Sequence, residues 1–145
     1  MMLQAQYKDL LQHPDIRFDM PENGGYIEVK DAATHDTLAW VKSHDRASVE
    51  QVIARSQKAQ TAWKAQTALQ RADVLWAWFD LMQENKESLA QILTAEQGKP
   101  LAEARGEIGY AASFIRWFAE QARRIDGEVL TPTLPNQRLL VIKQA

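Results

Sequence analysis

The stretch that decides the fold spans residues 96–127 and reads EQGKPLAEARGEIGYAASFIRWFAEQARRIDG. It contains Gly98, Lys99 and Pro100 in succession. This order predicts that one helix ends and another begins, because glycine adopts the left-handed conformation after a last turn and proline suits only a first turn. The residues that follow predict a long helix, which we expect Gly127 to end.

The predicted long helix carries apolar residues on two faces. The first face repeats every seven residues, whereas the second is an aromatic stripe. The first comprises Leu101, Ala104, Ile108, Ala111, Ile115, Phe118, Ala122 and Ile125, and the second comprises Tyr110, Phe114 and Trp117. We therefore expect cover on both faces. If the repeat forms the core, Phe118→Ala should cost about 3 to 5 kcal/mol, and Tyr110→Ala much less.

Three shorter helices are predicted upstream of the long one. Thr67 and Gln70 form a capping-box pattern, in which two side chains satisfy free backbone amides of the first turn. Asn85 can cap the following helix. The apolar spacing places these helices at about residues 45–64, 68–84 and 85–97, and it turns Leu75, Trp78, Phe79 and Met82 of the second helix inwards.

Strands are predicted on both sides of the helices. Tyr26–Lys30 and Thr37–Lys42 are rich in β-forming residues and suggest an antiparallel hairpin with a longer loop. Near the end of the chain, a proline-bounded loop separates residues 128–131 from residues 138–143. The second of these segments has four successive apolar residues, which fit a strand buried on both faces. Residues 2–12 can form a short amphipathic helix. The predicted fold class is mainly α with a β-hairpin and terminal strands.

Composition excludes several classes of function. The 17 Lys and Arg against 19 Asp and Glu give no electrostatic reason to expect nucleic acid or an anionic membrane as partner. No leader pattern or apolar run of about 18 residues is present, so we expect a cytoplasmic protein. The absence of cysteine excludes disulfides, thiolate metal sites and a cysteine nucleophile within these 145 residues. His13, His35 and His44 lack zinc-site spacing, so no metal is expected.

Candidate functional residues lie on the predicted long helix. Gly106 and Gly109 each cost a helix about 1 kcal/mol relative to alanine, which indicates close packing of another element or a ligand channel. Glu103 and Glu107 lie one turn apart and could act as acid and base, although exposed helix carboxylates are far commoner. From spacing alone, the aromatic stripe is more often core than substrate wall.

Two segments, EQGKPLAEARGEI and YAASFIRWFAE, resemble the aldehyde dehydrogenase superfamily, and within it the bacterial NAD(P)-dependent succinate-semialdehyde dehydrogenase branch. AWKAQTALQRADVLWAWFDLMQENKESLAQIL is similar to the two family helices before that run, and RLLVIKQ to a strand before the first nucleotide-binding strand. The resemblance implies the N-terminal fragment of an α/β aldehyde-dehydrogenase fold. It implies an N-terminal arm at 1–35, a helical part flanking the nucleotide-binding domain at 36–127, and the start of the bridging strands used in oligomerisation at 128–145.

The resemblance also implies that the catalytic and cofactor-binding groups of the complete enzyme lie outside this segment. In the family, NAD(P)-dependent oxidation proceeds by thiolate attack on the aldehyde, hydride transfer and hydrolysis of the thioester. The groups that do this lie downstream of the matched part, so no catalytic or cofactor-binding residue is expected here, and the chain alone should be inactive. NAD or NADP is expected only in the complete enzyme. The positions closest to the family's substrate tunnel are Gly106, Glu107, Tyr110 and Phe114.

Two interpretations of the chain therefore stand beside each other. The first is a scaffold segment of an aldehyde dehydrogenase that forms a homo-oligomer through the apolar helix and the terminal strand. The second is a stand-alone helical module that self-associates or binds a partner protein, because large apolar patches mark such interfaces.

Overall fold

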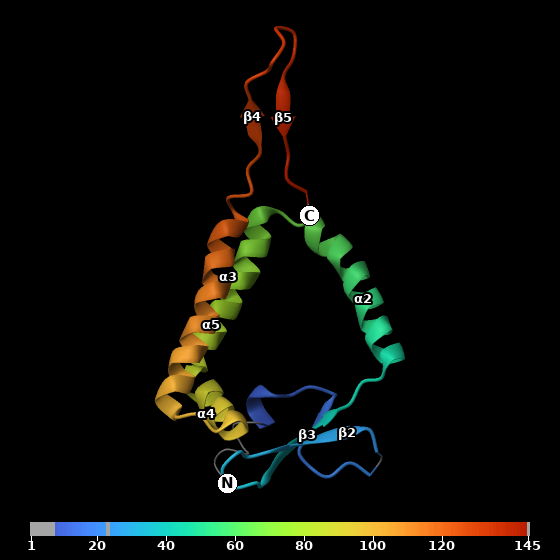
Figure 1. Cartoon of the computed structure of the whole chain (residues 1–145), viewed down its shortest axis with the longest axis vertical. Coiled ribbons are helices and arrows are strands. Elements are labelled where there is room, and N and C mark those ends of the chain that lie inside the picture. Colours follow the sequence, from blue (N-terminus) through green and yellow to red (C-terminus); the bar gives the residue numbers. More distant parts are fainter. Residues whose placement is uncertain (1–7, 23, 145) are drawn as a thin grey trace.

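The computed structural model describes residues 8–22 and 24–144. Its elements follow the order β1 (Ile16–Arg17), β2 (Tyr26–Lys30), β3 (Thr37–Lys42), α2 (Arg46–Ala65), α3 (Ala68–Glu84), α4 (Lys86–Gln97), α5 (Leu101–Ala122), β4 (Glu128–Leu130) and β5 (Leu139–Val141). Figure 1 shows an open frame in which α3 and α5 lie side by side, α2 stands on the opposite side, and β4 and β5 project as a hairpin.

The small sheet at the base of the frame has the order β1-β3-β2 and is antiparallel throughout. The predicted pairing of β2 with β3 is confirmed. The two-residue β1 was not predicted, because it is too short to show alternation. Residues 8–10 are helical, whereas residues 1–7 of the helix predicted at 2–12 lie outside the described residues.

The core at the base joins the sheet to α4. Leu38 of β3 packs with Ile92 and Ala95 of α4, and three partly buried residues, Leu10, Leu11 and Phe18, lie against them. The Ala32 amide donates to the Ala95 carbonyl oxygen at 2.9 Å, which fixes the loop between β2 and β3 to the end of α4. This contact orients α4, and through it α5.

The helix starts follow their capping residues. Asp45 accepts from the Ser48 amide at 2.8 Å and caps α2, and the Thr67–Gln70 capping box opens α3 as predicted. Asn85 occupies the cap position of α4, but the prediction that its side chain caps that helix was wrong. Its Nδ2 donates instead to the Leu81 carbonyl oxygen at 2.8 Å, which also accepts from the Asn85 backbone amide at 3.1 Å.

The buried face of α5 differs in part from the predicted seven-residue repeat. Ala104, Ala112 and Ala119 are fully buried, whereas Ala111 and Phe118 are exposed. The drift of a straight helix against a repeat of seven is only about 20° per seven residues, less than the roughly 100° between neighbouring residues. The buried face of α5 is therefore set by its packing against both α3 and α4. Because Phe118 is 58% exposed, the expected cost of 3 to 5 kcal/mol for Phe118→Ala rested on the wrong face.

The end of α5 also differs from the prediction. The helix stops at Ala122, with Arg123 as its C-cap, and Gly127 lies beyond it at the start of the hairpin. A Cβ added to Gly127 would collide with the carbonyl oxygen of Val141 in β5. The glycine is therefore required by a close approach of two backbones and not by the end of a helix.

Several predicted inward faces are uncovered in this chain. No residue of α2 is buried, and Trp78 of α3 is 54% exposed although it was expected inside. In the terminal strand, Leu140 is 73% exposed, so burial on both faces is not observed. The accessible surface is 11277 Å², against about 7,500 Å² for a compact protein of this mass.

Gly98 and Gly106 give a stability test with opposite signs. Gly98 has φ +79° and ends α4, and an added Cβ would lie 3.1 Å from Ala32 Cβ. We expect Gly98→Ala to lower the free energy of unfolding by about 1 to 2 kcal/mol. Gly106 lies inside α5 with nothing within 4 Å of an added Cβ, so Gly106→Ala should raise it by about 0.5 to 1 kcal/mol. Urea melts of both variants measure this, and two changes of the same sign would contradict it.

Candidate functional site

The four candidate residues share the exposed side of α5. Gly106, Tyr110 and Phe114 recur every four residues and Glu107 is adjacent, so they lie on one face, opposite the buried alanines. The Tyr110 and Phe114 rings meet edge to face, with centroids 4.9 Å apart and planes at 84°. Their side chains are 67% and 48% exposed. The structure thus forms an open aromatic wall, whereas spacing alone favoured a core position.

Glu107 is held beside this wall by Lys99. The Lys99 ammonium group forms an ion pair with the Glu107 carboxylate, and the Lys99 side chain is only 21% exposed. Gly98 and Lys99 were predicted as helix punctuation alone, so this second role of Lys99 was missed. No signal shows it in the sequence, because the pair spans the turn between α4 and α5.

A second ion pair fixes α5 against α4. The Arg105 guanidinium donates two hydrogen bonds to the Glu87 carboxylate, Nε to Oε2 and Nη2 to Oε1, each at 2.7 Å. Such two-point geometry restricts orientation as well as distance. Together with the packing of the buried alanines, it favours one rotation of α5 against α4. The two residues are 18 positions apart, so sequence patterns did not predict the pair.

The Glu87 carboxylate should make the free energy of unfolding of this chain depend on pH in the acid range. Hydrogen bonds from Arg105, and then from Gln91, lower the pKa of Glu87 from 4.5 to about 2. The contribution of a carboxylate with a lowered pKa is complete above its unfolded pKa of 4.5 and is lost as pH falls towards about 2. In urea melts, lowering the pH from 4.5 to about 2 should reduce the free energy of unfolding less in Glu87→Gln and in Arg105→Gln than in the wild type. Acid profiles identical to that of the wild type would contradict the assignment.

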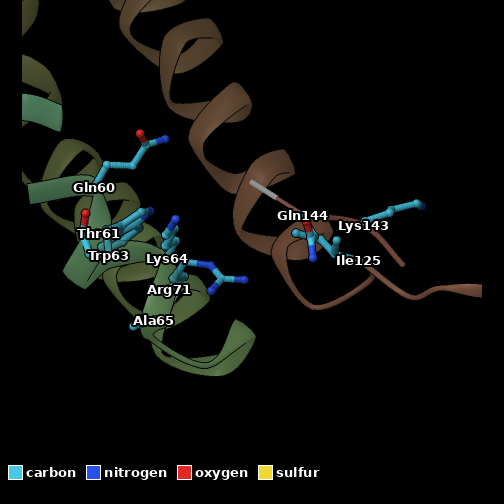
Figure 2. A pocket seen from close by; sticks show the side chains of 9 residues that line it. All are labelled: Gln60, Thr61, Trp63, Lys64, Ala65, Arg71, Ile125, Lys143 and Gln144. Carbon is cyan, nitrogen blue, oxygen red and sulfur yellow. The ribbon is translucent and has the colours of Figure 1, made fainter. Parts of the chain in front are cut away.

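A cavity lies away from the aromatic wall, at the junction of α2, α3 and the base of the hairpin (Figure 2). It is open, with a volume of about 770 Å³, and it is lined by Gln60, Thr61, Trp63, Lys64, Ala65, Arg71, Ile125, Lys143 and Gln144. None of these residues was predicted as a site from the sequence, because they come from segments that only the fold brings together.

In the part of the chain that the structure describes, neither the aromatic wall nor the cavity offers a metal-binding group of side chains. Among residues 8–22 and 24–144, no group of three or more His, Asp or Glu side chains could hold a metal ion. Within the same part of the chain, no helix is long and apolar enough to cross a membrane. The aromatic wall can exclude water and contact an apolar part of a ligand. Glu107, beside this wall, is engaged in an ion pair with Lys99.

The chain is similar in sequence to a known family and to characterised members of it. The Aldehyde dehydrogenase family matches residues 19–145. The chain is 49% identical over 123 residues to glutarate-semialdehyde dehydrogenase of Pseudomonas putida KT2440, covering 85% of this chain and 26% of that protein. It is 47% identical over 122 residues to the NADP(+) succinate-semialdehyde dehydrogenase of Escherichia coli K12, covering 84% and 25%.

A solved structure shows the same fold over nearly the whole chain. Betaine aldehyde dehydrogenase of Staphylococcus aureus, solved in complex with NAD+, superposes with a TM-score of 0.78 on 95% of this chain and 29% of that one, at 21% identity. The chain thus spans about a quarter of the length of the curated relatives, in their N-terminal part. The predicted fold class, an N-terminal fragment of an aldehyde-dehydrogenase fold, is confirmed. With the family matched over residues 19–145, the chain belongs to the aldehyde dehydrogenase family.

Proposed function

We propose that this chain is the N-terminal scaffold segment of an enzyme that oxidises succinate semialdehyde, or a similar carboxylate-bearing aldehyde, to the carboxylic acid with NAD or NADP. The observation that carries the proposal is identity of 47–49% to two relatives that are both named for semialdehydes. The chain covers only about a quarter of each relative, so the activity belongs to the complete protein.

Within the complete protein, this chain supplies scaffold helices and part of the wall of the substrate path. Tyr110 and Phe114 form a rigid apolar wall beside the substrate path, and the Arg105–Glu87 pair holds the helix that carries them. These 145 residues contain no cysteine to supply the thiolate. NAD or NADP accepts the hydride in such a reaction, and no glycine-rich strand–turn–helix in the described residues would cradle its phosphates.

A fusion tests the proposed activity. Residues 1–145 are joined to the downstream three quarters of the E. coli relative, and formation of reduced cofactor is followed by absorbance. We expect turnover of succinate semialdehyde, with a clearly lower kcat/KM for an uncharged aldehyde of equal length. The downstream part alone serves as the control and should be inactive. A folded fusion without turnover would contradict the proposal.

The aromatic wall gives a sharper prediction in the same fusion. Phe114→Ala should lower kcat/KM about tenfold, equivalent to about 1.4 kcal/mol of lost transition-state stabilisation. Its effect on the stability of the 145-residue chain should be small, because Phe114 is 48% exposed there. Trp78→Ala is the matched control, since it removes a similarly exposed aromatic side chain from α3. Equal losses of kcat/KM in the two variants would remove Phe114 from the substrate path.

The exposed hairpin favours the second candidate function, a stand-alone helical module that self-associates. Val129, Leu140 and Ile142 are 71–80% exposed along β4, β5 and the residue after β5. Apolar strands in this position favour pairing with a second copy. If the chain acts as a stand-alone module, light scattering of the 145-residue protein should show a defined oligomer. A monodisperse monomer at high concentration would rule this candidate out.

A further inference from the structure

The Lys99–Glu107 ion pair lies at the edge of the aromatic wall. Glu107 precedes Tyr110 by three residues and Phe114 by seven, so its side chain projects from the same exposed side of α5. The Glu107 side chain is 48% exposed, whereas that of Lys99 is 21% exposed. A half-exposed carboxylate at the wall is thus paired with a mostly covered ammonium group.

The turn between α4 and α5 determines where Lys99 lies. Gly98 ends α4 with φ +79°, and its amide donates to the Thr94 carbonyl oxygen at 2.8 Å. Pro100 is the N-cap residue of α5, and its carbonyl oxygen accepts from the Ala104 amide at 3.1 Å. The backbone is therefore fixed on both sides of Lys99, and the turn directs this side chain to Glu107.

The charge at the edge of the wall matters for the proposed substrate. Succinate semialdehyde carries a carboxylate at the end remote from the aldehyde, so an unpaired Glu107 would repel it. At an effective permittivity of about 20, two like charges about 8 Å apart repel strongly enough to weaken binding at least about tenfold. The ammonium group of Lys99 largely cancels this repulsion, whereas an uncharged aldehyde would not experience it.

Other charged groups near the wall do not replace Lys99. Glu103 lies one turn before Glu107 and is also exposed, so it adds negative charge to the same side of α5. Lys86 belongs to α4 and approaches α5 from the side that packs, where its Nζ would lie 3.2 Å from a Cβ added to Gly109. Lys99 is therefore the cation that balances the carboxylate at the wall.

We propose that Lys99 is a specificity-determining residue, which admits an aldehyde that carries a carboxylate by neutralising Glu107 beside the aromatic wall. The proposal rests on the proposed function, because it takes such an aldehyde as the substrate of the complete enzyme. Lys99 contacts neither the reacting carbonyl group nor the cofactor, and it acts through Glu107.

Steady-state kinetics of the fusion with two aldehydes test this. Succinate semialdehyde is the charged probe, and butanal is the uncharged probe with the same number of carbon atoms. Lys99→Met removes the ammonium group and keeps an apolar side chain, so it should raise KM for succinate semialdehyde about tenfold. It should leave kcat, and KM for butanal, within about twofold of the wild type. Equal changes in KM for the two aldehydes, or no change in either, would overturn the proposal.

Ionic strength separates lost charge balance from a displaced wall. Because Glu107 is half-exposed, dissolved salt screens its repulsion of the substrate. The rise in KM caused by Lys99→Met should therefore shrink at least about threefold when about 0.5 M salt is added. A rise that stays the same at both salt concentrations would indicate a structural effect and would count against the proposed role.

Glu107→Gln supplies the rescue. Combined with Lys99→Met, it leaves neither charge at the wall, so KM for succinate semialdehyde should return to within about twofold of the wild type. A double variant as impaired as Lys99→Met would contradict the proposal. Should Lys99→Met not fold, Glu107→Gln alone decides: the freed ammonium group should lower KM for succinate semialdehyde at least about twofold, and an unchanged or higher KM would refute the role of Lys99.

Lys30→Met is the matched control. Lys30 Nζ lies 3.3 Å from the Glu28 carboxylate, and both residues belong to β2 in the sheet at the base of the frame. This substitution also unpairs a glutamate and changes the net charge of the fusion by the same amount. KM for succinate semialdehyde should stay within about twofold of the wild type. A rise equal to that of Lys99→Met would show that the position of Lys99 is not decisive.

The wild-type fusion separates this inference from the proposed function. A folded wild-type fusion that does not oxidise succinate semialdehyde would contradict the proposed function, and the role of Lys99 would fail with it. Turnover by the wild-type fusion, together with an unchanged KM in Lys99→Met, would contradict the role of Lys99 alone.

Discussion

Replacement of Ala112 by leucine is expected to lower the free energy of unfolding by about 1 to 3 kcal/mol. Ala112 is fully buried on the side of α5 that packs against α3 and α4. A methyl group there allows the helices to approach closely, and a larger side chain forces them apart or into strained rotamers. The loss is read from urea denaturation of the 145-residue chain, followed by circular dichroism.

Ala111→Leu is the matched control for this prediction. Ala111 is the next residue in the same helix, but it is exposed, so the substitution should change stability by no more than about 0.5 kcal/mol. The pair also separates the two assignments of the core face, because the seven-residue repeat places Ala111 inside and the structure places Ala112 there. Equal losses, or a larger loss for Ala111→Leu, would contradict the structure.

The helix boundaries could be predicted from the sequence because local chemistry determines them. The Thr67–Gln70 capping box and the left-handed Gly98 act within one turn, and both are observed as predicted. The faces of the helices depend on partners far away in the chain. Trp78 has the spacing of an inward residue but is exposed, because nothing in this chain covers that side of α3.

The candidate site was predictable only in part. The four-residue spacing of Gly106, Tyr110 and Phe114 places them on one face in any α-helix, and the structure has them there. Their exposure could not be derived, since a core stripe and an open wall have the same pattern. The ion pairs of Glu107 with Lys99 in the preceding turn and of Glu87 with Arg105 in the next helix were missed, because such pairs leave no periodic signal.

The second large effect concerns catalysis. The 145-residue chain should show no oxidation of succinate semialdehyde, whereas its fusion with the downstream part of the E. coli relative should turn over at an enzymatic rate. Enzymes exceed uncatalysed rates by at least about a millionfold, so the contrast is expected to be complete. The physical reason is that this chain offers an apolar wall and ion-paired carboxylates, but no thiolate to attack the aldehyde.

The most direct test of the central claim is the absorbance of reduced cofactor when the purified 145-residue chain is mixed with succinate semialdehyde and NAD or NADP. The account predicts a rate equal to that of buffer with both cofactors, at every concentration of the chain. A rate above buffer that rises in proportion to the chain, and persists after repeated purification, would contradict it.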